Sequence, residues 1–290
     1  MMNQGDLKHE YAQIGSVRLH YAQAGNGEKL VLLLHGFPEF WYSWRHQMVA
    51  LSDDFTIIAP DMRGYNLSDK PPNIADYQTD KLVDDVLGLI RHFGREKAAI
   101  VGHDWGATVA WTVAQKHPEM VGKLAALQVP PVQVWRKNQS LRQFLTSWYM
   151  FLFQLPVLPE WIASRNDFAL LEESLRTKTV RKDVFTDADI AEYKKSWREE
   201  NSLSSAINYY RANVFSRFLA PRDDLNEKIK VPTLFIYGEK DFAILPETVK
   251  NVGEFIDAPF TEIRIPDAGH WVQQEAAEEV NAVLRDFLND

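Results

Sequence analysis

Gly102-His103-Asp104-Trp105-Gly106 decides the fold of this chain through the segments on either side of it. A short apolar run, 98–101, precedes the pentapeptide, and a helical pattern over 108–116 follows it. A sharp turn from a strand into a helix strains its central residue, and the flanking positions must be small so that strand and helix can approach each other. Gly-x-nucleophile-x-Gly is the signature of such a turn, and the residue at its centre here is Asp104.

The aspartate indicates which kind of carbon this turn can attack. A carboxylate that attacks a saturated carbon forms an ester, and water can cleave that ester and restore the carboxylate. A serine in the same place would form an ether, which ends the reaction after one turnover. Asp104 therefore points to the opening of an epoxide ring or the displacement of a halide. An ordinary strand–turn–helix with an exposed aspartate fits the same five residues, because the pattern is short.

Strands and helices alternate through both ends of the chain. Apolar runs and period-two alternation predict strands, and apolar residues three and four apart predict helices. This alternation is typical of an α/β fold with a mostly parallel central sheet and helices on both faces. We expect strands at 17–21, 30–34, 55–59, 98–101, 124–127, 233–237 and 260–265, and helices at 80–93, 108–116 and 274–288.

Residues 130–225 have a different pattern, in which aromatic and charged helical segments predominate and no strand is expected. We expect them to form a helical cap, inserted after the strand at 124–127 into a core made of residues 1–129 and 226–290.

The longest apolar stretch, 144–163, lies within this cap. Its two prolines, Pro156 and Pro159, interrupt it, and the unbroken part is too short to cross a bilayer. The stretch therefore predicts a helix that covers a pocket, without stable membrane insertion.

The composition excludes several classes of site and partner. The 290 residues include no cysteine, so disulfides, thiolate metal sites and a cysteine nucleophile are ruled out. The net charge is −8 without a block of like charges, which speaks against nucleic acid or an anionic membrane as a partner. The chain has no Gly-rich phosphate loop and no clustered ligand set, so we expect no metal and no other cofactor. The first thirteen residues lack the apolar core of a signal peptide, and a cytoplasmic location is expected. The oligomeric state is left open.

Two further residues lie where an aspartate nucleophile needs them. Asp241 follows the strand at 233–237, with Glu239 as a rival acid, and His270 follows the last strand. Nucleophile, acid and histidine thus occur in the chain order of the hydrolases that use this turn, at the carboxyl ends of strands, where open sheets build their sites. His35 and His103 lie near the same edge, but His103 is part of the tight turn, which makes His270 the better base.

These residue types predict a two-step reaction. Asp104 attacks carbon, and His270 then removes a proton from the water that cleaves the Asp104 ester. Asp241 accepts a hydrogen bond from the other ring nitrogen of His270 and fixes its tautomer. The ester hydrolysis passes through an oxyanion, for which the backbone N–H groups of Phe37 and Trp105 are the expected donors. A cis peptide bond before Pro38 fits this tight turn.

Four motifs together resemble the soluble epoxide hydrolases of the α/β-hydrolase superfamily, in the branch that uses an aspartate nucleophile. The likeness extends from about Tyr11 to the end of the chain. It implies an α/β-hydrolase fold, no cofactor, and a small apolar epoxide and water as reactants. The motifs are His35-Gly36-Phe37-Pro38-Glu39, Asp61-Met62-Arg63-Gly64-Tyr65, Gly102-His103-Asp104-Trp105-Gly106 and Gly269-His270-Trp271.

The resemblance also implies two cap tyrosines that protonate the opening epoxide. Tyr149 lies in a segment, 148–156, that is similar to the first of them, and Tyr210 in a segment similar to the second, 208–211. Tyr209 is the neighbour that could be confused with Tyr210, but on a helix the two point about 100° apart and only one can face the site. An alkoxide needs a donor such as a phenol, whose pKa is about 10, whereas a departing halide needs only weak N–H donors.

Two alternatives stay open at this point. Haloalkane dehalogenases share the aspartate ester, although they commonly carry Asn or Glu where Phe37 stands. A non-catalytic ligand receptor could share the fold, because fold alone does not establish function. In either enzyme, Phe37, Trp105, Met150 and Phe153 are the side chains expected to contact the substrate.

Overall fold

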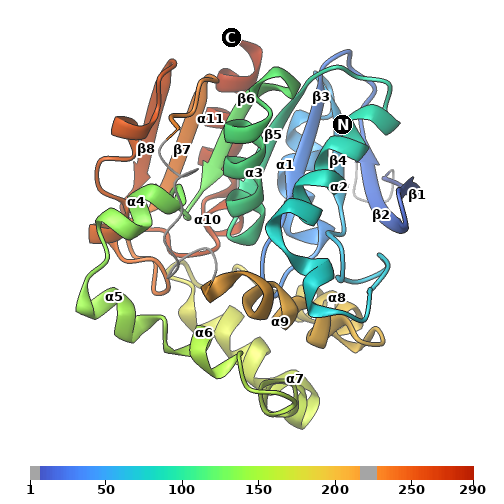
Figure 1. The fold of residues 1–290 in the computed structure, drawn as a ribbon, viewed down its shortest axis with the longest axis vertical. Coiled ribbons are helices and arrows are strands. Elements are labelled where there is room, and N and C mark those ends of the chain that lie inside the picture. The colour runs from blue at the N-terminus through green and yellow to red at the C-terminus, as the bar shows by residue number, and fades with distance from the viewer. Residues whose placement is uncertain (1–6, 216–226) are drawn as a thin grey trace.

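The structure is a computed structural model that describes residues 7–215 and 227–290. One eight-stranded sheet runs through the molecule in the order β1-β2-β4-β3-β5-β6-β7-β8, with helices on both faces (Figure 1). The predicted α/β architecture with a mostly parallel sheet is therefore confirmed. The strands are β1 (Lys8–Ile14), β2 (Val17–Ala24), β3 (Leu30–Leu34), β4 (Thr56–Pro60), β5 (Ala98–His103), β6 (Val121–Leu127), β7 (Thr233–Gly238) and β8 (Phe260–Ile265).

The helices packed on the sheet differ from the prediction at three places. The helix at Arg45–Leu51 was not predicted. α3 begins immediately after Asp104, whereas the sequence pattern placed its start at 108. The predicted helix 274–288 is divided into two at Ala276, which leaves helical geometry with φ −122° and ψ 43°. These helices are α1 (Arg45–Leu51), α2 (Thr79–His92), α3 (Trp105–Lys116), α10 (Val272–Glu275) and α11 (Ala277–Asn289).

One edge of the sheet contains a strand that the sequence did not predict. β1 pairs with β2 in antiparallel register, from Lys8 opposite Gln23 to Ile14 opposite Val17. Only Ala12 of β1 is buried, so this strand lacks the apolar alternation that reveals a strand in a sequence. β2 and β4 are also antiparallel, and every pairing from β4 to β8 is parallel.

β3 shows how one unbroken apolar run contributes to two cores. All five of its side chains are buried. Leu30, Leu32 and Leu34 pack with side chains of α2 and α3 on one face of the sheet. Val31 and Leu33 pack with side chains of α1 and α11 on the other. Because successive side chains of a strand point to opposite faces, a strand buried on both faces is apolar at every position.

The turn between β5 and α3 places Asp104 at the carboxyl edge of the sheet. Its φ of 52° and ψ of −116° are strained for a residue with a side chain. A Cβ atom on Gly102 would collide with the backbone of Gly106, and one on Gly106 would collide with the carbonyl of Leu34 in β3. Strand, turn and helix therefore approach as closely as the pentapeptide predicts.

The segment between β6 and β7 is helical, with no strand between residues 130 and 215. In Figure 1, α5 to α9 lie together below the sheet. The predicted end of the cap at residue 225 lies outside the described residues, so the division into core and cap stays a prediction. The helices are α4 (Val132–Lys137), α5 (Leu141–Thr146), α6 (Trp148–Leu152), α7 (Leu158–Lys178), α8 (Asp187–Arg198) and α9 (Ser202–Asn213).

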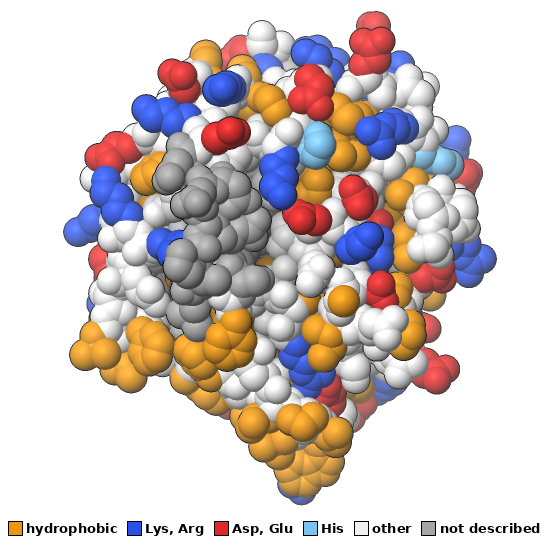
Figure 2. All heavy atoms as spheres, viewed as in Figure 1, with side chains coloured by type: hydrophobic (Ala, Val, Ile, Leu, Met, Phe, Trp, Pro, Cys, Tyr) orange, Lys and Arg blue, Asp and Glu red, His pale blue; other side chains and the backbone are white. Residues whose placement is uncertain are grey.

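The apolar stretch 144–163 forms parts of three helices, α5, α6 and α7, instead of the single helix that was predicted. α7 begins beside Pro159, which lies in its first turn. Tyr149, Met150 and Phe153 pack against the core. Figure 2 shows other apolar side chains gathered at the lower end of the molecule, where Figure 1 places these helices. Within residues 141–163, the most exposed apolar side chains are those of Leu141, Leu145, Trp148, Val157 and Trp161. None of the described helices is long and apolar enough to cross a bilayer.

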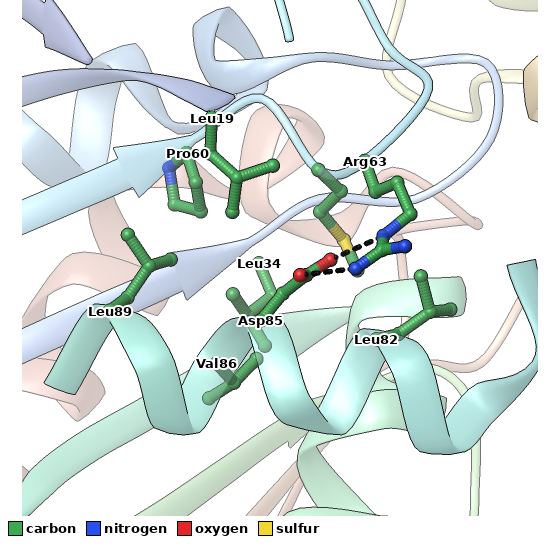
Figure 3. Close-up of a pocket in the computed structure, with 9 residues that line it drawn as sticks. Leu19, Leu34, Pro60, Arg63, Leu82, Asp85, Val86 and Leu89 are labelled. Carbon is green, nitrogen blue, oxygen red and sulfur yellow. Dashed lines mark hydrogen bonds and ion pairs between the residues drawn. The ribbon is translucent and has the colours of Figure 1, made fainter. Parts of the chain in front are cut away.

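A buried ion pair joins the loop after β4 to α2. Arg63 donates from Nε and Nη2 to the two carboxylate oxygens of Asp85, at 2.8 and 2.6 Å (Figure 3). The pair borders a small hollow lined by Leu19, Leu34 and Leu89, among others. Because this arrangement is bidentate, it fixes the direction of the Arg63 backbone, whose carbonyl contacts the cap.

We expect Gly106→Ala to lower the free energy of unfolding by about 1–3 kcal/mol, because the new methyl group has no space against the Leu34 carbonyl. Urea unfolding followed by circular dichroism measures this loss. Gly122→Ala is the matched control: its Cβ would meet only the Ala98 carbonyl, at 3.7 Å, which is an ordinary contact. Equal stability of the two variants would contradict the close approach of β5 and α3.

Candidate active site

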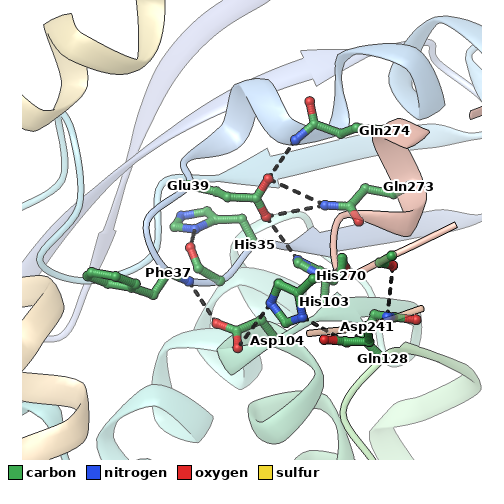
Figure 4. Close-up of polar contacts among 12 residues, drawn as sticks. His35, Phe37, Glu39, His103, Asp104, Gln128, Asp241, His270, Gln273 and Gln274 are labelled. Atoms are coloured by element: carbon green, nitrogen blue, oxygen red, sulfur yellow. Dashed lines mark hydrogen bonds and ion pairs between the residues drawn. The ribbon is translucent and has the colours of Figure 1, made fainter. Parts of the chain in front are cut away.

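The Asp104 carboxylate lies between a backbone donor and a histidine (Figure 4). Its Oδ1 accepts a hydrogen bond of 2.8 Å from the backbone N–H of Phe37. Its Oδ2 lies 3.8 Å from Nε2 of His270. The side chain is 15% exposed, so one side of this mostly buried carboxylate is still open.

Backbone geometry supplies the donors around Asp104. The turn that follows β3 contains Gly36, where a Cβ atom would overlap the Asp104 side chain, and this close approach brings the Phe37 amide within reach. The peptide bond from Phe37 to Pro38, which the sequence left open, is cis. Trp105 is the first residue of α3, and amides in the first turn of a helix have no partner within the helix. The positive end of the α3 dipole thus also faces the carboxylate.

His270 and Asp241 form a buried pair beside this carboxylate. The loops after β7 and β8 bring Nδ1 of His270 within 2.9 Å of Asp241 Oδ2. Asp241 Oδ1 accepts the backbone N–H groups of Ala243 and Ile244 at 2.7 and 2.9 Å. These bonds fix the acid, which in turn orients the imidazole with Nε2 toward Asp104.

Gln128 completes the pair and was missed by the sequence reasoning. It is fully buried after β6, at φ 69°, and donates from Nε2 to Asp241 Oδ2 at 2.7 Å and to the Gly269 carbonyl at 2.9 Å. Its Oε1 accepts the backbone N–H of Gly238. Gln128 thus ties together the ends of β6, β7 and β8. The one feature of the sequence that could have pointed to Gln128 as a site residue is its place directly after the predicted strand 124–127.

The surroundings of His270 favour its protonated form. Burial alone would lower the pKa of His270, but the charge and hydrogen bond of Asp241, with the charges of Asp104 and Glu39, raise the pKa to about 9. His270 in the free protein is therefore an imidazolium at neutral pH, paired with Asp241 and close to Asp104.

The rival residues are engaged elsewhere. Glu239 points toward Arg264, at 3.9 Å. His35 accepts the backbone N–H of Met62 at Nε2, and its Nδ1 lies 3.1 Å from the Gly36 carbonyl. His103 lies under the turn, between Glu39 and the backbone of His270.

Tyr149 and Tyr210 lie together on the cap side of Asp104, with ring centroids 6.0 Å apart. The Tyr210 ring is edge-on to Trp105 at 5.1 Å and to Phe37 at 5.6 Å. Burial comes first among the causes that raise the pKa of both phenols, and the charge of Asp104 raises both further. Both tyrosines therefore keep their protons at neutral pH.

Tyr209 points away from these residues. Its hydroxyl donates to the Arg63 carbonyl at 2.7 Å, and its ring lies against Tyr65 and Tyr77. This anchor directs the next residue of α9, Tyr210, toward Trp105.

The four expected substrate contacts surround the same place. Phe37 and Phe153 meet edge-on at 5.4 Å, and Phe153 also contacts the rings of Tyr210 and Tyr149. Trp105 is buried, whereas Met150 is partly buried against the same core. The resulting surface is aromatic and apolar, with hydroxyls from the two tyrosines. Within residues 7–215 and 227–290, no three His, Asp or Glu side chains are grouped as a metal site.

Comparisons with known proteins place this geometry among hydrolases. The sequence model of the alpha/beta hydrolase fold family matches residues 29–277. Epoxide hydrolase 1 of Caenorhabditis elegans is 40% identical over 287 residues, which cover 96% of this chain and 70% of that protein. An AB hydrolase superfamily protein of Bacillus subtilis is 36% identical, covering 98% of this chain and 99% of that protein. The crystal structure of an epoxide hydrolase from Bacillus megaterium with an inhibitor matches with a TM-score of 0.86 at 33% identity, covering 97% of this chain and 100% of that chain.

We expect Asp241→Asn to lower the pKa of His270 from about 9 to below its ordinary 6.5. Burial lowers this pKa, and the variant lacks the Asp241 charge that counters the effect of burial. An NMR titration of the imidazole measures this shift. Glu239→Gln is the control: it removes the rival acid and should leave the pKa near 9. A large shift in the control, or none in Asp241→Asn, would reverse the assignment of the acid.

Proposed function

This chain belongs to the epoxide hydrolase branch of the α/β hydrolase family, and we propose that it hydrolyses epoxides to vicinal diols through a covalent ester at Asp104. One observation carries the proposal: the carboxylate of Asp104 lies between the Phe37 amide and His270, and two protonated tyrosines lie together on the cap side.

The contacts of Asp104 support a division of labour between its two oxygens. Oδ1 is held by the Phe37 amide, which leaves Oδ2 to attack a carbon of the epoxide ring. The C–O bond of the ring breaks, and the released alkoxide takes a proton from Tyr149 or Tyr210. Apolar rings around the reacting atoms keep them out of bulk water, where such charges would be screened.

The raised pKa values of the tyrosines are compatible with this acid role. An alkoxide is about as basic as hydroxide, so the pKa of its conjugate acid lies far above that of an ordinary phenol. A phenol with a raised pKa can therefore still protonate it. Part of the rise comes from the negative charge of Asp104, and that charge disappears when the ester forms. Each phenol thus becomes more acidic as the alkoxide appears.

The same loss of charge prepares His270 for the second step. Asp104 helps to hold the pKa of His270 at about 9, so the pKa falls once the carboxylate has become a neutral ester. His270 then releases its proton to solvent, the tyrosine that protonated the alkoxide regains one from solvent, and the neutral His270 can accept a proton from water. The water attacks the ester carbon, and the oxyanion that forms on Oδ1 already faces the Phe37 amide and the start of α3. Collapse breaks the bond between the ester carbon and Oδ2, His270 gives the proton it took from water to the departing oxygen, and the carboxylate is restored as the diol leaves.

We expect His270→Gln to form the ester but not to hydrolyse it. After incubation with a panel of epoxides, intact-protein mass spectrometry should show a gain equal to the whole epoxide. A gain equal to an alkyl group, with release of halide from a haloalkane, would instead favour a dehalogenase. No adduct from any of the substrates would overturn the Asp104 ester mechanism.

We expect Tyr149→Phe combined with Tyr210→Phe to lower kcat for epoxides at least 100-fold, because the alkoxide then lacks its proton donors. The matched control is Tyr209→Phe, which removes the neighbouring hydroxyl that binds the Arg63 carbonyl. Steady-state kinetics at pH 7 compare the variants. Near-normal turnover of the double variant would refute both acid assignments.

A further inference from the structure

His103 and Glu39 form a buried pair behind His270 (Figure 4). Both side chains are fully buried. Nδ1 of His103 lies 2.9 Å from Glu39 Oε2, and Nε2 lies 2.8 Å from the backbone carbonyl of His270. The mechanism proposed above uses neither residue.

The hydrogen bonds of His103 determine how many protons its ring carries. A neutral imidazole has one N–H group and one acceptor nitrogen. Here each ring nitrogen faces an oxygen, one from a carboxyl group and one from a carbonyl. The carbonyl can only accept, so Nε2 carries a proton, and the second proton is shared along the contact with Glu39.

The neighbours of Glu39 decide on which side that second proton lies. The guanidinium of Arg45 can only donate, and its Nη1 donates to Oε1 of Gln274 at 2.5 Å. The amide nitrogen of Gln274 must therefore face the other way, and it donates to Glu39 at 2.6 Å. The same amide donates to the Tyr193 hydroxyl, which in turn donates to Glu39 at 3.2 Å. The Gln273 amide is a further donor. A carboxyl group surrounded by donors is stabilised as the carboxylate, so the proton resides on His103.

We propose that His103 is a permanent imidazolium, paired with Glu39, and that this ion pair positions His270 and keeps it able to accept a proton from water. The role in water activation rests on the function proposed above; the ionic state of the pair does not. Neither residue touches the reacting atoms, so both are positioning residues.

The positioning of His270 by His103 rests on the hydrogen bond between His103 Nε2 and the backbone carbonyl of His270. It fixes the backbone of the base on the side opposite Asp241, which holds the ring at Nδ1. The base is thus restrained through its backbone and its side chain at once.

The charge of His103 acts on the protonation of His270, because the two ring centroids are 5.0 Å apart. Asp104, Asp241 and Glu39 favour a proton on His270, and Glu275 is a further acid that interacts with it. His103 is the one cation that faces the ring in the described structure, and it opposes that proton. When Asp104 becomes a neutral ester, the cation remains, and the balance shifts toward neutral His270.

The cap contributes to this arrangement through α8. Tyr193 reaches Glu39, and Trp197, one turn further along, donates from Nε1 to the Pro38 carbonyl at 2.7 Å. α8 therefore holds both the acid of the ion pair and the turn that presents the Phe37 amide.

The first experiment reads the proton count directly in the whole protein. Nitrogen-15 NMR of histidine-labelled protein should show both ring nitrogens of His103 protonated at pH 8, with the signals assigned by their absence in His103→Gln. A neutral ring, with a single protonated nitrogen, would overturn the proposal even if the Asp104 ester forms as expected. If His270→Gln instead forms no ester, the ester mechanism fails, and the NMR result still decides the ionic state.

The second experiment follows the two steps of the reaction in His103→Gln by single-turnover kinetics. Glutamine removes the cation and leaves the Glu39 carboxylate, whose charge favours a proton on His270, so His270 should keep its proton more strongly. In a plot of the rate constant for ester hydrolysis against pH, the rate falls at acidic pH as His270 becomes protonated. We expect this acidic limb to move to higher pH by about one unit, so that hydrolysis at pH 7 slows about tenfold. Ester formation should change less than about threefold.

Asp85→Asn is the matched control for the loss of a buried ion pair, since Asp85 is paired with Arg63 on another part of the sheet. It should destabilise the protein and leave the acidic limb in place. An unmoved limb in His103→Gln, or a limb that moves equally in His103→Gln and Asp85→Asn, would show that the pair has a merely structural role.

Discussion

Close backbone approach at Asp104 is the constraint on which the site depends. The residue occupies a strained conformation at φ 52°, which persists because β5, α3 and the turn after β3 pack against it without intervening side chains. Glycine at 36, 102 and 106 makes this approach possible, and a methyl group at any of them would overlap backbone or the carboxylate itself. The same contact that strains Asp104 brings the Phe37 amide to Oδ1. The strain at Asp104 and the donor expected to bind the oxyanion thus share one structural cause.

Charge organises the site as strongly as packing does. Three carboxylates, those of Asp104, Asp241 and Glu39, surround the buried His270 and raise its pKa to about 9. A base with that pKa is protonated at neutral pH and unable to take a proton from water. In the proposed mechanism, formation of the ester at Asp104 removes one of the three charges when the base is needed, which links the two steps without any movement of the protein. This link requires only that Asp104 lie close to His270, and Nε2 and Oδ2 are 3.8 Å apart.

The sequence predicted the parts of the molecule in which local pattern and tertiary environment agree. Strands buried on both faces, such as β3, were found because every position is apolar. β1 was not, because an edge strand with one buried residue carries no such pattern. Asp104, Asp241 and His270 follow strands and could be placed at one edge of the sheet. Gln128 and Glu39 could not be assigned roles, because their importance comes from partners more than one hundred residues away, such as Asp241 and Gln274. A lone buried amide or acid has no sequence signature of its own.

The helices between β6 and β7 build the site from two directions, which argues against regarding them as a simple cover. α6 and α9 present Tyr149 and Tyr210 toward the nucleophile, and the bond from Tyr209 to the Arg63 carbonyl fixes the rotation of α9. α8 meets the core on the other side, where Trp197 holds Pro38 and Tyr193 holds Glu39. A displacement of α8 would therefore loosen the donor at Phe37 and the support of His270 together, although neither residue belongs to the cap. Asp104 stands at the edge of the sheet, but the groups around its carboxylate are held in place by the helices between β6 and β7.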